Sequence, residues 1–219
     1  MSPTPVRVLV ETTPKRAFVS ALDWPGWSRG ARAEEAAVEA LLAVAPRYTP
    51  VAAAAGYSLD VDGLVIEVTE RLGGDAGTAF GVPAIVAAAD REPVEAAAAH
   101  RQAAIVEAAW AELDRIAAAA PEELRKGPRG GGRDRSKVVR HVVEAEAAYA
   151  AAMGRKHRPD DPAALAAMRA DILHILRQPS DGSSIAGRRW PPRYAARRIA
   201  WHVLDHAWEI EDRSEPGAG

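Results

Sequence analysis

The chain contains no cysteine among its 219 residues. This absence excludes disulfides, thiolate metal ligands and a cysteine nucleophile. Any metal ion held by the protein must therefore be bound by histidine, carboxylate or water. A thiol that took part in its chemistry would have to be supplied from outside the chain.

Aromatic residues are also scarce, at 5% of the chain, and the formal net charge is only −2. A charge so close to zero gives no overall attraction to nucleic acid or to anionic membranes. No stretch reaches the ~20 apolar residues of a membrane-spanning helix, and residues 1–10 lack the pattern of a secretory signal. We therefore expect a cytoplasmic protein with no membrane partner and no clear nucleic-acid partner.

The first third of the chain predicts a small α+β domain over residues 1–75. Residues 24–30 are expected to form an aromatic loop, because they hold two tryptophans and two glycines. Residues 33–45 have the apolar spacing of a helix, and we expect Pro46 to end it. Short apolar runs rich in β-branched residues indicate strands at 6–10, 17–22 and 64–68.

The second half predicts an all-α domain over residues 93–213, joined to the first by a linker over 76–92. Its apolar residues recur at helical spacing in four segments. Four amphipathic helices with connections of moderate length favour a four-helix bundle. The tail, 214–219, is expected to be disordered. The expected helices cover residues 95–119, 136–153, 165–178 and 192–212.

Two histidines, His202 and His206, lie on the apolar face of the last expected helix. They are four residues apart, so their rings stand one above the other, ~6 Å along the helix axis. This spacing lets two imidazoles bind one metal ion. His141 lies on the apolar face of the helix expected over 136–153. Packing the two faces together would bring three imidazoles to one point.

The sequence therefore predicts a metal site made of His141, His202 and His206. Three protein ligands leave one position open for water or substrate, as in catalytic zinc sites. The alternative is that these are hydrogen-bonded core histidines that bind no metal. We do not expect His100, His157 or His174 to be ligands.

Ligating imidazoles usually donate their second N–H to a carboxylate or a carbonyl. Glu144 follows His141 by three residues, and Glu209 follows His206 by three. Both glutamates are therefore candidates for hydrogen bonds to a ligand, and both also fit an ordinary solvated position on a helix.

Residues 137–146, which include His141, together with residues 201–209, which include His202 and His206, resemble the DinB superfamily. The resemblance covers about residues 92–213 and implies an up-down-down-up four-helix bundle. It also implies a divalent metal ion, zinc or nickel, on the three histidines. Characterised members resemble thiol transferases or isomerases that use low-molecular-weight thiols such as bacillithiol or mycothiol, so a thiol or another small molecule becomes an expected partner. Many members form homodimers.

Residues 18–45 are similar to a HicB-like domain, again an α+β fold. The match consists of a strand, the Asp23-Trp24-Pro25-Gly26 segment, Gly30 and the helix that follows. No DNA-binding segment comes after it in this chain. The resemblance therefore implies an interaction domain rather than an antitoxin.

Two groups of basic residues precede the proposed ligands, one before His141 and one before His202. If the two groups met in space, the mouth of the site would be positive and would suit an anionic substrate or thiol. The alternative is that they are solvated loop residues. The groups are Arg125, Lys126, Arg129, Arg133, Arg135, Lys137 and Arg140, and Arg188, Arg189, Arg193, Arg197 and Arg198.

The leading hypothesis is a metal-dependent thiol transferase or hydrolase acting on a small molecule. A divalent ion on three imidazoles lowers the pKa of a bound water or thiol and so generates the nucleophile. The alternative is a non-enzymatic regulatory or interaction module in which the metal is structural.

Overall fold

The structure, a computed structural model, describes residues 5–126 and 132–214. Its first part contains four strands in the order β3-β2-β1-β4, so the predicted α+β class is confirmed. β1 pairs antiparallel with β2 and parallel with β4, and β2 pairs antiparallel with β3. The strands are β1 (Val6–Thr13), β2 (Arg16–Ala21), β3 (Ser28–Ala31) and β4 (Ile66–Gly73).

Strand β3 corrects the prediction of a continuous loop over residues 24–30. Residues 28–31 form the edge of the sheet, where they pair with β2. The ring of Phe18 fills the space that a Cβ on Gly30 would occupy, 2.6 Å from the ring. The sequence pattern was too short and too rich in glycine to indicate a strand.

The first helix is longer than predicted, because α1 spans Glu34–Ala54 and continues through Pro46 and Pro50. A proline inside a helix removes a backbone hydrogen bond and disfavours the turn before it. The turns beyond Pro46 bury Tyr48, Val51 and Ala52 almost completely. This burial offsets the lost hydrogen bonds, so the expectation that Pro46 ends the helix was wrong.

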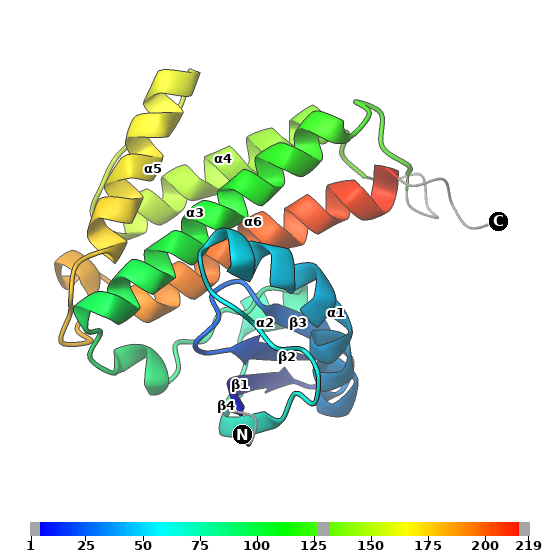
Figure 1. Cartoon of the computed structure of the whole chain (residues 1–219), viewed down its shortest axis with the longest axis vertical. Coiled ribbons are helices and arrows are strands. Elements are labelled where there is room, and N and C mark those ends of the chain that lie inside the picture. Colours follow the sequence, from blue (N-terminus) through cyan, green and yellow to red (C-terminus); the bar gives the residue numbers. More distant parts are fainter. Residues whose placement is uncertain (1–4, 127–131, 215–219) are drawn as a thin grey trace.

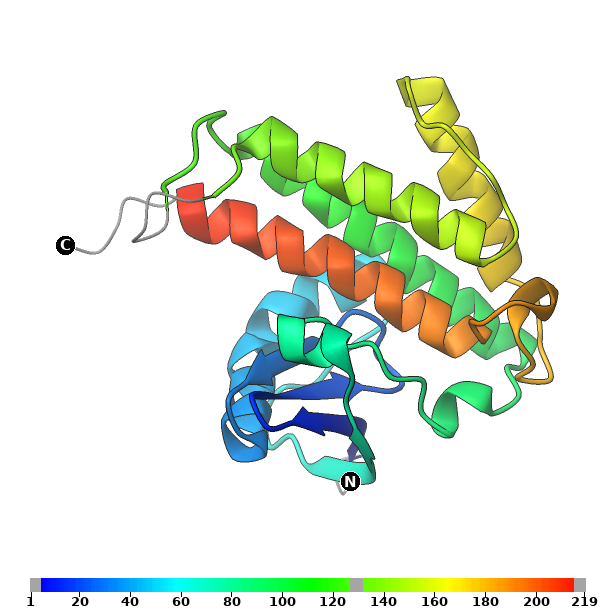
Figure 2. The same cartoon turned by 180° about the vertical axis from the view of Figure 1, so that it is seen from behind.

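Two helices cover opposite faces of the sheet, α1 on one side and the short α2 (Ala76–Phe80) on the other (Figure 2). The buried carboxylate of Glu11 on β1 holds the segment around α2 in place. It accepts hydrogen bonds from the Thr78 hydroxyl at 2.7 Å and from the backbone N–H groups of Ala84 and Ile85 at 3.0 and 3.1 Å. The segment expected as a linker thus contains α2 and a 3₁₀ turn, η1 (Ala89–Arg91).

The second part of the chain is helical, and all four predicted helices are present. Helices α3, α4 and α6 run alongside one another, whereas α5 is set at a steep angle to them and contacts α3 and α4 (Figure 1). The helices are α3 (Ala96–Ala119), α4 (Arg135–Ala152), α5 (Pro162–Leu176) and α6 (Pro192–Ser214), with a 3₁₀ turn, η2 (Ile185–Gly187), before α6.

Two helix ends differ from the prediction. α5 begins at Pro162, three residues early, because Asp161 caps its first turn by accepting a hydrogen bond from the Ala164 N–H at 2.8 Å. α6 extends to Ser214, the first residue of the expected disordered tail. The other tail residues, 215–219, lie outside the described part of the chain.

The two halves of the chain share one hydrophobic core, which runs from the sheet and α1 through α3 to α6. Gly26 allows the loop after β2 to press against α6. Its φ is +92°, and a Cβ there would lie 2.8 Å from Leu204 and 3.0 Å from the Ala200 Cβ. α6 is therefore held between the sheet on one side and α3 and α4 on the other. Within the described ranges, no helix combines the length and apolar character that crossing a lipid bilayer requires.

Candidate metal centre

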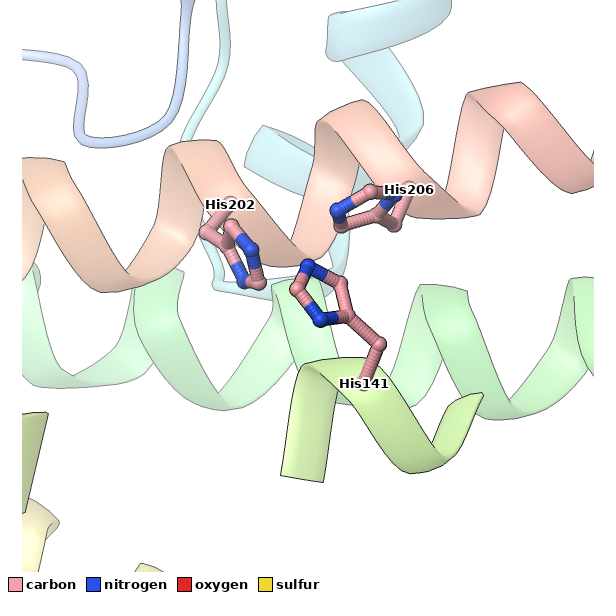
Figure 3. Close-up of side chains that lie close together, drawn as sticks. All are labelled: His141, His202 and His206. Carbon is pink, nitrogen blue, oxygen red and sulfur yellow. The ribbon is translucent and has the colours of Figure 1, made fainter. Parts of the chain in front are cut away.

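The three predicted histidines come together between α4 and α6. His141 projects from α4, and His202 and His206 project from successive turns of α6 toward it (Figure 3). The ring centroids are 4.6 to 5.2 Å apart, and one potential ligand atom from each ring lies within 4.8 Å of the other two. The predicted geometry is confirmed: the three histidines lie close enough to hold one metal ion.

A second feature of this cluster is a buried ring nitrogen without a partner. The Nδ1 atom of His202 is inaccessible to solvent and has no hydrogen-bond partner among the described residues. Core histidines normally satisfy both ring nitrogens, because an unpaired buried polar atom costs about 1–3 kcal/mol. The three imidazoles therefore fit a divalent cation better than they fit a set of ordinary core residues.

Glu209 fixes the orientation of the third histidine. Its Oε2 atom lies 2.7 Å from Nδ1 of His206, and its Oε1 atom accepts a 2.8 Å hydrogen bond from Arg213. The hydrogen bond from His206 is the main reason that the pKa of Glu209 is lowered. Because an ionised carboxylate only accepts, Nδ1 of His206 is the donor, which leaves Nε2 as the ring nitrogen that could bind a metal.

We expect Glu209→Gln to weaken binding of a divalent metal by about 10–100-fold, the usual effect of removing a hydrogen-bond partner of a ligand. Titration of the metal-free protein with zinc against a chromophoric chelator measures the change. Glu144→Gln is the matched control, since Glu144 has the same offset from His141 but is 68% exposed, and its ion pair is with Arg140, at 3.9 Å. Equal affinities for the two variants would contradict the role given to Glu209.

Burial disfavours the charged forms of His141 and His202. Desolvation is the largest cause of the lowered pKa of both His141 and His202, and the pKa of His202 falls to about 2. The other histidines and the cations Arg198 and Arg133 lower the pKa of His202 further. Neutral imidazole is the form that binds metals, so protons compete weakly with a metal here at neutral pH.

The metal-free protein should lose stability as the pH falls below about 6.5, the ordinary pKa of histidine. Below that pH the unfolded chain gains a proton on His202 while the folded chain does not, which favours unfolding. At pH 5 this costs ~2 kcal/mol from His202 alone. Urea unfolding from pH 8 to pH 5 measures the slope.

His202→Leu should flatten this dependence, whereas the exposed His174→Gln should leave it unchanged. Identical slopes in the wild type and His202→Leu would show that His202 titrates normally in the folded protein. The difference between variants is informative because other groups also contribute to the pH dependence, including the buried Glu11, whose pKa is raised by desolvation.

The remaining histidines stay away from the centre, as predicted. His100 and His174 are exposed. His157 lies in the loop after α4, where its Nε2 is 3.0 Å from Asp171. Tyr149 is a further neighbour of the centre, which the sequence did not single out. Its ring contacts that of His202 edge-on, with centroids 5.6 Å apart.

Arg129 lies outside the described part of the chain, and the described members of the two basic groups do not form one positive mouth. Arg135, at the start of α4, donates to the carbonyl of Ala120 just after α3 ends. Arg193, at the start of α6, donates to the carbonyl of Pro93 just before α3 begins. The starts of α4 and α6 therefore lie at opposite ends of α3. Single cations from each group, Arg133 and Arg198, are still near enough to act on His202.

The ion pair of Glu209 with Arg213 was not predicted, although the spacing of four residues on one helix is a local signal for such a pair. Arg213 also donates to the carbonyl of Arg125, at 2.8 Å, so the end of α6 is tied to the segment after α3.

Comparisons of this chain with protein-family models, with curated proteins and with solved structures gave no match.

Proposed function

We propose that this protein binds one divalent metal ion, zinc or nickel, on His141, His202 and His206 and uses it to act on a small molecule. The observation that supports this most strongly is the convergence of three imidazoles, one of them with a buried, unpartnered ring nitrogen. Glu209 adds the hydrogen bond that ligating histidines usually make.

Three protein ligands leave a coordination position for an external molecule. A bound divalent ion supplies Lewis-acid chemistry there, lowering the pKa of a coordinated water or thiol. His141 and His206 are only partly buried, so solvent reaches the site at these two side chains. Since the chain has no cysteine, a low-molecular-weight thiol must come from outside. The reaction class proposed is thiol transfer or hydrolysis.

The helix directions agree with this proposal. α3 and α4 are antiparallel, since α4 begins where α3 ends. α6 begins beside the start of α3, where Val94 and Ser180 pair through backbone hydrogen bonds of 2.7 and 2.9 Å. α5 comes between α4 and α6 in the chain and is set at a steep angle to the other three helices. We interpret this arrangement as a variant of the up-down-down-up bundle of the DinB superfamily.

The test is a spectroscopic titration of the cobalt-loaded protein with a small thiol such as β-mercaptoethanol. Cobalt(II) occupies zinc-type sites and reports its ligands by visible absorption. We expect one cobalt per chain and a new sulfur-to-cobalt charge-transfer band when the thiol is added. His202→Ala should show neither the bound cobalt spectrum nor the thiol response.

A non-enzymatic role is the second candidate, and the exposed apolar residues of the first part favour it. Phe80 on α2 is 87% exposed and Val65 before β4 is 47% exposed. In that role the first part would bind a partner, consistent with a HicB-like interaction domain, and the metal would only stabilise the helices. This second candidate would be supported if cobalt binds and raises the melting temperature while its visible spectrum does not change on addition of a thiol.

A further inference from the structure

Arg198 lies on α6 one helical turn before His202. The two residues are four apart, so they share one face of the helix and are ~6 Å apart along its axis. Tyr149 of α4 faces this turn, because its ring contacts that of His202 edge-on, with centroids 5.6 Å apart. The guanidinium of Arg198 lies over the same Tyr149 ring, 5.3 Å from its centre. One aromatic ring thus contacts both this cation and a predicted metal ligand.

The cation has no counter-charge in the described part of the chain. Its neighbours on α6, Arg193 and Arg197, form ion pairs with Asp23 and Asp90. No described carboxylate lies within salt-bridge distance of Arg198, and its Nη1 atom is inaccessible to solvent and makes no hydrogen bond to a described residue. Charges taken out of water are normally paired, because their desolvation costs free energy. An anion from outside the chain would supply the missing partner.

Aromatic rings hold the guanidinium in place. It lies 4.8 Å from the centre of the Trp201 ring, and the Tyr149 ring packs in turn against Trp190, with centroids 5.3 Å apart. A guanidinium that stacks on aromatic rings can still present its N–H groups to a planar oxyanion. Because Arg198, Tyr149 and Trp190 are only partly buried, a small molecule can reach them from solvent.

The anion that best fits this position is a carboxylate. Its two oxygens match the fork of a guanidinium, which can donate two parallel hydrogen bonds to them. A singly charged carboxylate also costs less to remove from water than a dianionic phosphate does, which matters between partly buried rings. A molecule with its carboxylate at Arg198 would lie along α6 toward the three histidines.

We propose that the small molecule on which the metal acts carries a carboxylate, and that Arg198 binds this group one helical turn from the metal ligands. This inference rests on the proposed function, since it names a substrate class for the same centre. The metal would bind the thiol or other donor group at one end of the molecule, and Arg198 would bind the carboxylate at the other. Arg198 would thereby select anionic over neutral molecules.

The test compares two thiols of equal length, γ-mercaptobutyrate and its neutral amide, on the full-length protein. The sulfur-to-cobalt band of the cobalt-loaded protein measures the affinity for each thiol. Heteronuclear NMR of the zinc-loaded protein follows the indole N–H of Trp201, which lies beside Arg198. We expect the acid to bind about 10–100-fold more tightly than the amide, the usual effect of a hydrogen bond to a charged group, and only the acid to shift the Trp201 resonance. Equal affinities would overturn this inference and leave the proposed function standing.

Arg198→Gln should abolish the preference for the acid while leaving the affinity for the amide unchanged. Arg133→Gln is the matched control, because Arg133 is exposed and is the other arginine whose charge acts on His202; it should keep the preference. A preference that survives Arg198→Gln would show that the carboxylate chelates the metal instead. An equal loss in both variants would indicate a long-range field rather than contact, and either result overturns the inference. Should Arg198→Gln not fold, Arg198→Met, which keeps the packing of the apolar stem, takes its place.

Failure of the proposed function would be recognised separately. If neither thiol produced a charge-transfer band, thiol binding by the metal would be contradicted, and the NMR titration would still decide the role of Arg198. A shift of the Trp201 resonance with the acid alone, lost in Arg198→Gln, would support the carboxylate site. Absence of any shift would overturn it.

Discussion

Replacement of His202 by alanine should abolish metal binding and with it the largest stabilisation available to this protein. A ligand that binds only the folded state at 1,000 times its dissociation constant adds ~4.1 kcal/mol to the free energy of unfolding. For a chain of this size that corresponds to a rise in melting temperature of roughly 8–16 °C. We expect this rise on adding zinc to the wild type, and none for His202→Ala.

The same variant should lower the affinity by more than the ~100-fold that removal of an outer partner such as Glu209 produces, because only two imidazoles remain. His202 is 7% exposed and its Nδ1 is unpartnered, so the substitution also removes an unsatisfied buried atom. The metal-free variant should therefore fold. Calorimetric titration and elemental analysis measure the loss.

His174→Ala is the control for this experiment, since His174 is exposed on α5. Undiminished zinc binding by His202→Ala would show that the metal is held elsewhere. Loss of binding in both variants would point to a general effect of histidine replacement rather than to this site.

The three metal-binding candidates were predictable because the signal lies within single helices. The offset of four residues between His202 and His206 places both rings on one face of any helix, whatever surrounds it. The apolar residues around them, such as Ile199 and Val203, are all buried. The prediction that His141 lies beside the other two depended on packing between helices, and the apolar face around His141 was enough to make it.

Features that depend on long-range packing were not predictable. Glu146 reads as a solvated helix residue, yet it is fully buried and its carboxylate is 3.1 and 3.3 Å from the guanidinium of Arg169 on α5. The parallel pairing of β1 with β4 joins segments 60 residues apart along the chain. The course of α1 through Pro46 is decided by burial of Tyr48, which local propensity does not report.

Asp90→Ala should lower the free energy of unfolding by ~3–5 kcal/mol, because it breaks the buried Asp90–Arg197 ion pair. This is the second large effect that we expect. Asp90 is 1% exposed and Arg197 is 5% exposed. The carboxylate contacts Nε at 2.9 Å and Nη2 at 2.6 Å, and it also accepts the Ala87 N–H at 2.8 Å. Removing it leaves a buried guanidinium with no counter-charge. Urea denaturation measures the change.

Glu34→Ala is the comparison, because its partner Arg71 is 61% exposed and solvent-exposed ion pairs add little to stability. A double variant, Asp90→Ala with Arg197→Met, should recover much of the loss, since no buried charge then remains. Comparable costs for Asp90→Ala and Glu34→Ala would mean that water reaches Arg197.

The pair joins η1 to α6 five residues before His202, so it anchors the helix that carries two of the three imidazoles. Its loss should lower stability without changing the metal ligands themselves. Saturating zinc should therefore raise the melting temperature of Asp90→Ala by the same roughly 8–16 °C as in the wild type. A much smaller rise would show that the anchor also sets the spacing between α6 and His141, and that the metal centre depends on the junction of the two halves.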